Sequence, residues 1–214
     1  MSTGIGGMDP EMMERNALVL AAHGDLEKTR ELIASRPELV DEPGVGPAFG
    51  GERPLDAAAH THNRAIAQAL LDAGATHNIY SAVFMGEYDT VSEMLKANPA
   101  LAQTPGVHDI PILGFVEDHS MAEMLIEAGA NVNAMSRAPF QITPLHGAAR
   151  RGNVRVVETL LLNGADITAR DYNGKTPRDL ATDEDVIALL DAQAGEATRP
   201  SPLQTERYPG NEHQ

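Results

Sequence analysis

The sequence predicts an all-α solenoid of about six stacked helix-turn-helix units. The first observation is a period, because the Thr-Pro pair at 143–144 returns at 176–177, 33 residues later. The second is a match without a gap between the segments 143–164 and 53–74. The third is composition: aromatic residues make up 4% of the chain and Trp is absent, whereas a β-sandwich would usually carry more aromatic and β-branched side chains.

The segment that begins at Thr143 shows the pattern of one unit, TPLHGAARRGNVRVVETLLLNGADITARDYNGKTP. Pro144 suits the first position of a helix, where a missing N–H costs little. Leu160 and Leu161 give a second helix an apolar face, and Gly164 can end that helix in the left-handed conformation. The segment 53–74 repeats these features and is the second unit.

The period and the Thr-Pro-Leu-His signature at 143–146 resemble the ankyrin repeat, and the resemblance covers about 16–194. It implies antiparallel helix pairs joined by β-hairpin fingers and a concave face that binds partner proteins. It also implies that His146 bridges neighbouring units by hydrogen bonds. The opening of the chain is similar to the first repeat of many bacterial ankyrin proteins, so the chain is identified as a bacterial-type, stand-alone ankyrin repeat domain.

Two units lack the Thr-Pro start. The segments 16–45 and 78–107 match at an offset of 62 residues, with Gly24 on Gly86 and Pro37 on Pro99. Both segments end in Pro-Gly-Val, which indicates the duplication of a module of two repeats.

The remaining units complete a single repeat domain at 11–194. A fourth, degenerate unit covers 110–134 and has a shortened turn with Ser120 as the expected N-cap. A partial sixth unit from Thr176 to about Ala194 closes the stack. We expect a flexible N-terminus at 1–10 and, because 195–214 is polar and contains Pro, a disordered C-terminal tail.

The spacing between units predicts an irregular junction. Only 24 residues separate Pro54 from Asn78, nine fewer than the period, so the finger between the second and third units is missing. Before it, the Gly- and Pro-rich loop 41–53 carries a single aromatic residue, Phe49. A long finger beside a missing one predicts a notch in the concave face.

The resemblance places the residues after the Ala-Ala pair of each first helix in the concave groove, with the finger loops leaning over it. These positions mix imidazole, carboxylate, guanidinium and apolar side chains. The predicted binding residues are His23, Phe49, His60, Thr61, Phe84, Met85, His108, Asp109, Glu117, Asp118, Arg137, Phe140, Arg150, Arg151 and Tyr172.

Two classes of function fit such a groove. The first is a protein-interaction module, an adaptor or regulator that binds a partner through the groove and the loop tips. The second is a small-molecule-binding protein or enzyme with a pocket near the missing finger, where His23, His60, Glu117 and Asp118 act as acid–base groups. The arginines at 150, 151 and 155 either receive an acidic partner or pair with neighbouring acids.

Charge and composition exclude several other functions. The chain carries 16 Lys and Arg against 31 Asp and Glu, a net charge of −15, which disfavours nucleic acids and anionic membranes. There are no cysteines, and the His60–His62 pair lacks the helical i, i+4 spacing of paired metal ligands. We therefore expect no cofactor and no metal. The sequence also lacks a signal-peptide pattern and a run of about 18 apolar residues, which predicts a cytoplasmic protein.

Overall fold

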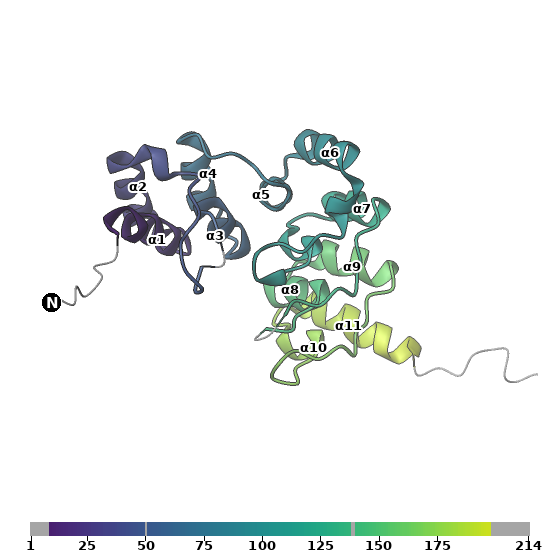
Figure 1. Cartoon of the computed structure of the whole chain (residues 1–214). Coiled ribbons are helices and arrows are strands. Elements are labelled where there is room, and N and C mark those ends of the chain that lie inside the picture. Colours follow the sequence, from purple (N-terminus) through teal and green to yellow (C-terminus); the bar gives the residue numbers. More distant parts are fainter. Residues whose placement is uncertain (1–8, 50, 138–139, 198–214) are drawn as a thin grey trace, which may run out of the picture.

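The structure, a computed structural model, describes residues 9–49, 51–137 and 140–197. These residues contain helices and loops and no strand, so the predicted all-α class is confirmed. Six helix pairs follow one another along the chain (Figure 1). The pairs are α1 (Pro10–Ala22) with α2 (Leu26–Ser35), α3 (Pro54–His60) with α4 (Arg64–Asp72), α5 (Ile79–Met85) with α6 (Tyr88–Ala97), the 3₁₀ helix η4 (Ile112–Phe115) with α7 (His119–Glu127), α8 (Pro144–Arg151) with α9 (Val154–Leu162), and α10 (Pro177–Leu180) with α11 (Glu184–Ala197).

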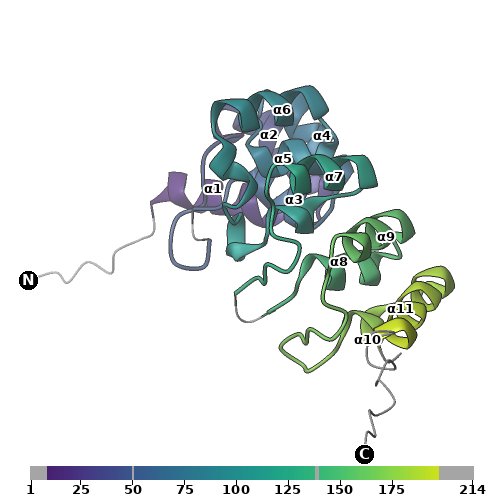
Figure 2. The same ribbon diagram turned by 90° about the vertical axis from the view of Figure 1, so that its right-hand side faces the viewer.

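The pairs stack in chain order. Each inner helix contacts the next, from α1 through α3, α5, η4 and α8 to α10, and α1 and α11 lie at opposite ends of the stack (Figure 1). The finger loops project on the side of the inner helices, away from α4, α6 and α9 (Figure 2). The Ala-Ala pairs at 58–59 and 148–149 are fully buried, so small side chains let neighbouring inner helices approach closely. The described helices include none that is both long and apolar enough to cross a membrane.

One capping device begins most of the second helices. A side-chain oxygen accepts the backbone N–H of the residue three positions ahead, which satisfies a donor that the helix leaves free. The residues that do this are Asp25, Asn63, Asp118 and Asn153. The predicted cap at Ser120 is wrong, because Asp118 accepts from the N–H of Met121 and α7 begins two residues earlier than expected.

The long loop 41–53 folds back on itself. The Gly44 N–H donates to the Glu52 carbonyl at 2.9 Å. The side-chain amide of Asn16 donates to the Val45 carbonyl and accepts a hydrogen bond from the Val45 N–H. Phe49 lies so close to Gly44 that a Cβ there would stand 2.8 Å from its Cγ atom. The second module closes its loop in the same way, with Gly106 N donating to the Ile110 carbonyl at 2.9 Å. The described residues of this loop are therefore packed against one another and against α1.

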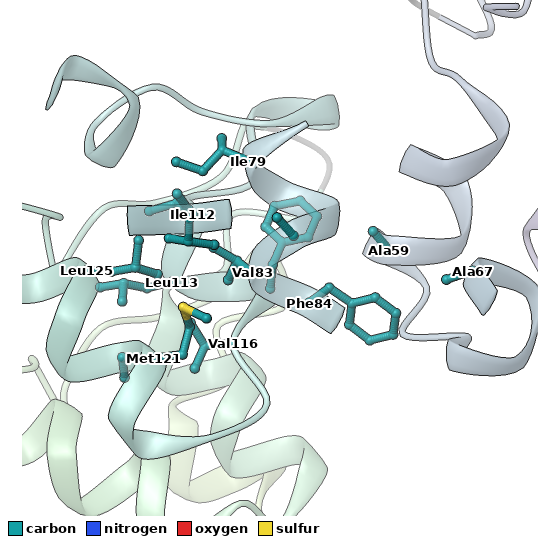
Figure 3. Close-up of a cluster of buried hydrophobic side chains, with 14 of the residues drawn as sticks. Ala59, Ala67, Ile79, Val83, Phe84, Ile112, Leu113, Val116, Met121 and Leu125 are labelled. Atoms are coloured by element: carbon teal, nitrogen blue, oxygen red, sulfur yellow. The ribbon is translucent and has the colours of Figure 1, made fainter. Parts of the chain in front are cut away.

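The finger between the second and third units is missing, as expected, because only a short segment joins α4 to α5. Side chains fill the space between the two units instead. Phe84, predicted to line the groove, is 1% exposed and points toward Ala59 and Ala67 of the second unit (Figure 3). The His62 ring stands edge-on to it at 5.4 Å, and the Arg64 guanidinium lies 5.2 Å from its centroid. Because no finger separates the two units there, the Phe84 side chain packs between them.

The predicted ends of the domain fall at the limits of the described residues. Helix α11 continues to Ala197, three residues beyond the expected boundary at 194. The rest of the predicted tail, 198–214, and residues 1–8 of the predicted flexible N-terminus lie outside the described residues.

Candidate functional site

Three of the predicted groove histidines converge on a carboxylate that the sequence interpretation did not include. Glu52, 2% exposed, lies at the end of the long loop. Its Oε1 is 2.8 Å from His60 Nδ1, and its Oε2 is 3.5 Å from His23 Nε2 and 3.9 Å from His108 Nε2. We call these four residues the histidine–glutamate cluster.

The cluster joins elements that are far apart in the sequence. His23 follows the last residue of α1, and His60 ends α3. His108 lies in the short 3₁₀ turn Val107–Asp109 between the third and fourth units. The His60 ring contacts both others edge-on, with centroids 5.0 Å and 5.1 Å away. Stacking of the inner helices therefore places the ends of α1 and α3 beside one carboxylate.

A second network crosses the junction. His62 Nδ1 lies 2.5 Å from Glu117 Oε1, and its Nε2 lies 3.2 Å from the Arg151 guanidinium. Arg151 also donates to the Val116 carbonyl at 3.2 Å, and its Nε lies 3.7 Å from Glu117. Three units are linked in this way, since His62 belongs to the second, Glu117 to the fourth and Arg151 to the fifth.

Burial and charge act against each other in this network. Burial lowers the pKa of Arg151, and the Glu117 carboxylate opposes that shift. Burial acts to raise the pKa of Glu117, but the hydrogen bond from His62 and the charges of His62 and Arg151 outweigh it and lower that pKa below its ordinary value. Glu117 is therefore an ionised partner of His62 and Arg151.

Asp118 has a structural role. Its carboxylate caps α7 and accepts a hydrogen bond from the Tyr88 hydroxyl, and burial, followed by this bond, raises the pKa of Tyr88. The predicted acid–base set of His23, His60, Glu117 and Asp118 is therefore not a single site, since the carboxylate beside His23 and His60 is Glu52. The sequence did not signal Glu52, because it lies in an insertion with no counterpart in the regular repeat.

An open cleft of about 550 Å³ lies along the inner helices of the fifth and sixth units. Its walls include four predicted binding residues: His60, Thr61, Phe140 and Arg150. Three apolar side chains complete it, Ile110 and Ile142 from loops and Leu180 from the end of α10. Within the described part of the chain, the side chain of Arg150 makes no hydrogen bond or ion pair, so its guanidinium is free to bind a ligand.

The fingers beside the cleft expose aromatic side chains. Phe140 is 54% exposed and Tyr172, on the next finger, is 66% exposed. The two fingers meet where the Tyr172 N–H donates to the Phe140 carbonyl at 3.3 Å. Both predicted finger residues therefore lie on one surface.

The other predicted residues lie away from this cleft. Asp109 pairs with Arg137 at 3.0 Å, and both line a smaller cavity of about 310 Å³. The carbonyl of Met85 accepts from Arg64 at the junction, and Phe49 packs within its own loop.

Side chains near the starts of the inner helices have structural roles. His146 bonds Thr143 in its own unit and reaches the Lys175 carbonyl of the next finger at 3.1 Å. Asp56 and Asp179 accept the backbone N–H that precedes their helices. Such hydrogen bonds between units are what the repeat pattern implied for His146.

Stacked helix pairs with bridging fingers define the class of helical repeat proteins. A family model described as ankyrin repeats (many copies) matches residues 125–181. The chain is an ankyrin repeat protein. Its assignment to a bacterial type stays a prediction.

Curated relatives are similar in sequence to parts of this chain. BRCA1-associated RING domain protein 1 of Caenorhabditis elegans is 39% identical over 82 residues, which cover 37% of this chain and 12% of that protein. Ankyrin repeat and SOCS box protein 11 of Danio rerio is 50% identical over 48 residues, or 22% of this chain and 16% of that protein. The chain thus spans less than a fifth of the length of these relatives.

A solved structure also resembles the chain over most of its length. The ankyrin repeat domain of Bcl-3, a member of the IkappaB protein family, is 21% identical, with a TM-score of 0.47, and covers 82% of this chain and 97% of that one.

Proposed function

We propose that the protein is an adaptor or regulator that binds a partner protein through the cleft of the fifth and sixth units and the adjoining finger tips. The observation that carries the proposal is the unpaired Arg150 beside exposed Phe140 in an open cleft of about 550 Å³. Ankyrin repeat proteins generally act by protein interaction, and the proposal assigns that role to this surface.

The lining of the cleft indicates which side chains a partner would insert. Ile110, Ile142 and Leu180 offer an apolar wall, and Arg150 offers a guanidinium suited to bidentate binding of a carboxylate. Asp171 also lines the cleft, and its Oδ1 accepts hydrogen bonds from the backbone N–H groups of Asn173 and Lys175. The favoured ligand is therefore a partner segment with an apolar side chain next to an Asp, a Glu or a chain terminus.

Aromatic finger tips suit the same use. Phe140 and Tyr172 are large and exposed, and aromatic side chains with arginine dominate the binding energy of many protein interfaces. Their backbone contact joins two fingers into one surface. A partner that enters the cleft would therefore cover both rings.

The test compares two charge reversals on neighbouring helices. Arg150→Glu changes the cleft, whereas Arg155→Glu changes an exposed arginine on α9 that pairs with Glu158. Each tagged variant is expressed in the native host, and co-purified proteins are identified by mass spectrometry. We expect Arg150→Glu to reduce recovery of the partner at least about tenfold, the effect of 1.4 kcal/mol, and Arg155→Glu to retain it. Equal recovery with both variants, or no reproducible partner, overturns the proposal.

A further inference from the structure

We propose that the histidine–glutamate cluster binds a divalent first-row transition metal ion, of which Zn²⁺ fits best. His23, Glu52 and His60 are the primary ligands, and His108 is the fourth. The metal site shares His60 with the wall of the partner cleft, but the inference rests on other observations and does not depend on the proposed function.

The spacing of the ligand atoms suits a small metal ion. One ligand atom from each of His23, Glu52 and His60 lies within 4.8 Å of the other two. The distances to the Glu52 oxygens are 2.8 Å from His60, 3.5 Å from His23 and 3.9 Å from His108. Zn²⁺ with bonds of about 2.0–2.1 Å in a tetrahedron places its ligand atoms about 3.3 Å apart. The distances to the Glu52 oxygens lie within about 0.6 Å of this separation. Ligand atoms as far apart as 4.8 Å would approach one another by up to about 1.5 Å when the ion binds.

The hydrogen bonds of His23 leave an acceptor facing the carboxylate. Its Nδ1 lies 2.8 Å from the Val19 carbonyl, so the neutral ring carries its proton on Nδ1 and leaves the Nε2 lone pair free. That lone pair is directed to within 3.5 Å of Glu52 Oε2, which is also an acceptor. Two acceptors that face each other repel unless a proton or a metal ion lies between them, and a ring N–H bonded to a carbonyl is the usual support of a metal-binding histidine.

Glu52 itself lacks compensation. It is 2% exposed, and its Oε1 accepts no hydrogen bond among the described residues. His60 Nδ1 is near, but it satisfies hydrogen-bond geometry toward the Asp56 carbonyl at 3.2 Å. A buried, uncompensated carboxylate is costly. A metal ion bound by Oε1 and by His60 Nδ1, with the ring proton moved to Nε2, removes that cost.

The fold does not require a carboxylate at this place. In the closing hydrogen bond of the second module, Ile110 takes the place that Glu52 takes in the first. An apolar residue therefore suffices to close such a loop. The charge of Glu52 is explained by what it faces, namely three imidazoles.

The backbone of His108 also points to a bound ion. His108 and Asp109 have φ values of 55° and 53°, a left-handed conformation that non-glycine residues adopt rarely and at a cost. This conformation accompanies the approach of the His108 ring to His60 and Glu52. Coordination of the imidazole would compensate for the strained turn.

Two to three imidazoles and one carboxylate select among metal ions. Ca²⁺ and Mg²⁺ prefer sites made of oxygen ligands, whereas imidazole suits Zn²⁺ and its first-row neighbours. The expectation of no metal rested on the absence of cysteines and on the spacing of the His60–His62 pair, and His62 does turn away toward Glu117. The residues that converge with His60 lie in other repeats.

The experiment titrates Zn²⁺ into the untagged full chain after dialysis against EDTA, with calorimetry and thermal unfolding as measurements. We expect one equivalent to bind, and the melting temperature to rise by about 5–10 °C at a hundredfold excess over the dissociation constant. His60→Ala is expected to weaken binding more than about a hundredfold, whereas His119→Ala, outside the cluster, leaves it unchanged. Binding that survives His60→Ala, or no binding at all, overturns the proposal.

Glu52→Gln separates a metal site from a structural ion pair. The amide keeps the shape of the side chain and can donate to His23 Nε2, so the metal-free variant should melt at or above the wild-type temperature and lose the shift caused by Zn²⁺. A large fall in the metal-free melting temperature would show that Glu52 serves protonated histidines instead. Co²⁺ gives a further readout, because a site with three or four protein ligands produces intense visible absorption that the His60→Ala variant should lack.

Discussion

At the scale of single residues, the backbone of His62 departs most clearly from the repeat pattern. Its φ is 57°, and the matching glycines Gly86 and Gly152 have values of 80° and 70°. A residue with a Cβ pays of order 1–2 kcal/mol for this conformation. The ring recovers contacts to Glu117, Arg151 and Phe84. The sequence signal for this role is the replacement of a turn glycine, because His62 stands where the matching position of the fifth unit has Gly152.

Glu117→Gln tests whether this network stabilises the fold. Because the pKa of Glu117 is lowered in the folded protein, its ionised side chain stabilises the fold. This stabilisation is fully present above the pKa of a glutamate in the unfolded chain, about 4.3, and is lost as the pH falls through the pKa of Glu117 in the folded protein. The variant should therefore be about 1–3 kcal/mol less stable than the wild type at pH 7. This difference should shrink as the pH falls below about 4. Urea unfolding across this range measures the difference. A loss that does not depend on pH would contradict the ionised contact with His62 and Arg151.

At the scale of elements, the regular parts were predictable and the insertion was not. Thr143 and Pro144 fixed the start of α8, and the same spacing located α3 and α10, because capping and apolar periodicity are local properties. The position of Glu52 depends on a hydrogen bond between Gly44 and Glu52, eight residues apart, and on Phe49 filling the loop. No periodicity reports such a closure. His23, His60 and His108 were therefore predicted as groove residues, and the carboxylate that joins them was missed.

The loop 41–53 can be tested by a substitution at Gly44, with Gly24, which lies outside the loop, as the control. Gly44→Ala places a Cβ 2.8 Å from Phe49 Cγ, whereas a Cβ at Gly24 has nothing within 4 Å. We expect Gly44→Ala to cost about 1–3 kcal/mol, as overpacking does, and Gly24→Ala to remain within about 0.5 kcal/mol of the wild type. Equilibrium unfolding in urea measures both. Equal stability of the two variants would show that Phe49 does not hold the loop.

At the scale of the whole molecule, stability in a solenoid is a sum of units and of contacts between neighbours. The junction of the second and third units lacks a finger, so it depends on side chains. Arg64 donates to the carbonyls of Phe84 and Met85, and Phe84 packs toward Ala59 and Ala67 (Figure 3). This junction also separates His23 and His60 from most of the partner cleft. Its strength therefore decides whether the two proposed sites belong to one cooperative unit.

Phe84→Ala should uncouple the two parts of the stack. Phe84 is buried, and replacing a fully buried Phe by Ala lowers the free energy of unfolding by about 3–5 kcal/mol. Here the lost contacts belong to an interface between units. We expect hydrogen exchange of α1 to α4 and of α5 to α11 to become unequal, and unfolding to lose its single transition. Phe140→Ala, which removes an exposed ring, is the control and should leave one transition. A single, merely shifted transition in Phe84→Ala would mean that the remaining contacts, among them the Arg64 hydrogen bonds and the network of His62, Glu117 and Arg151, are enough to hold the junction together.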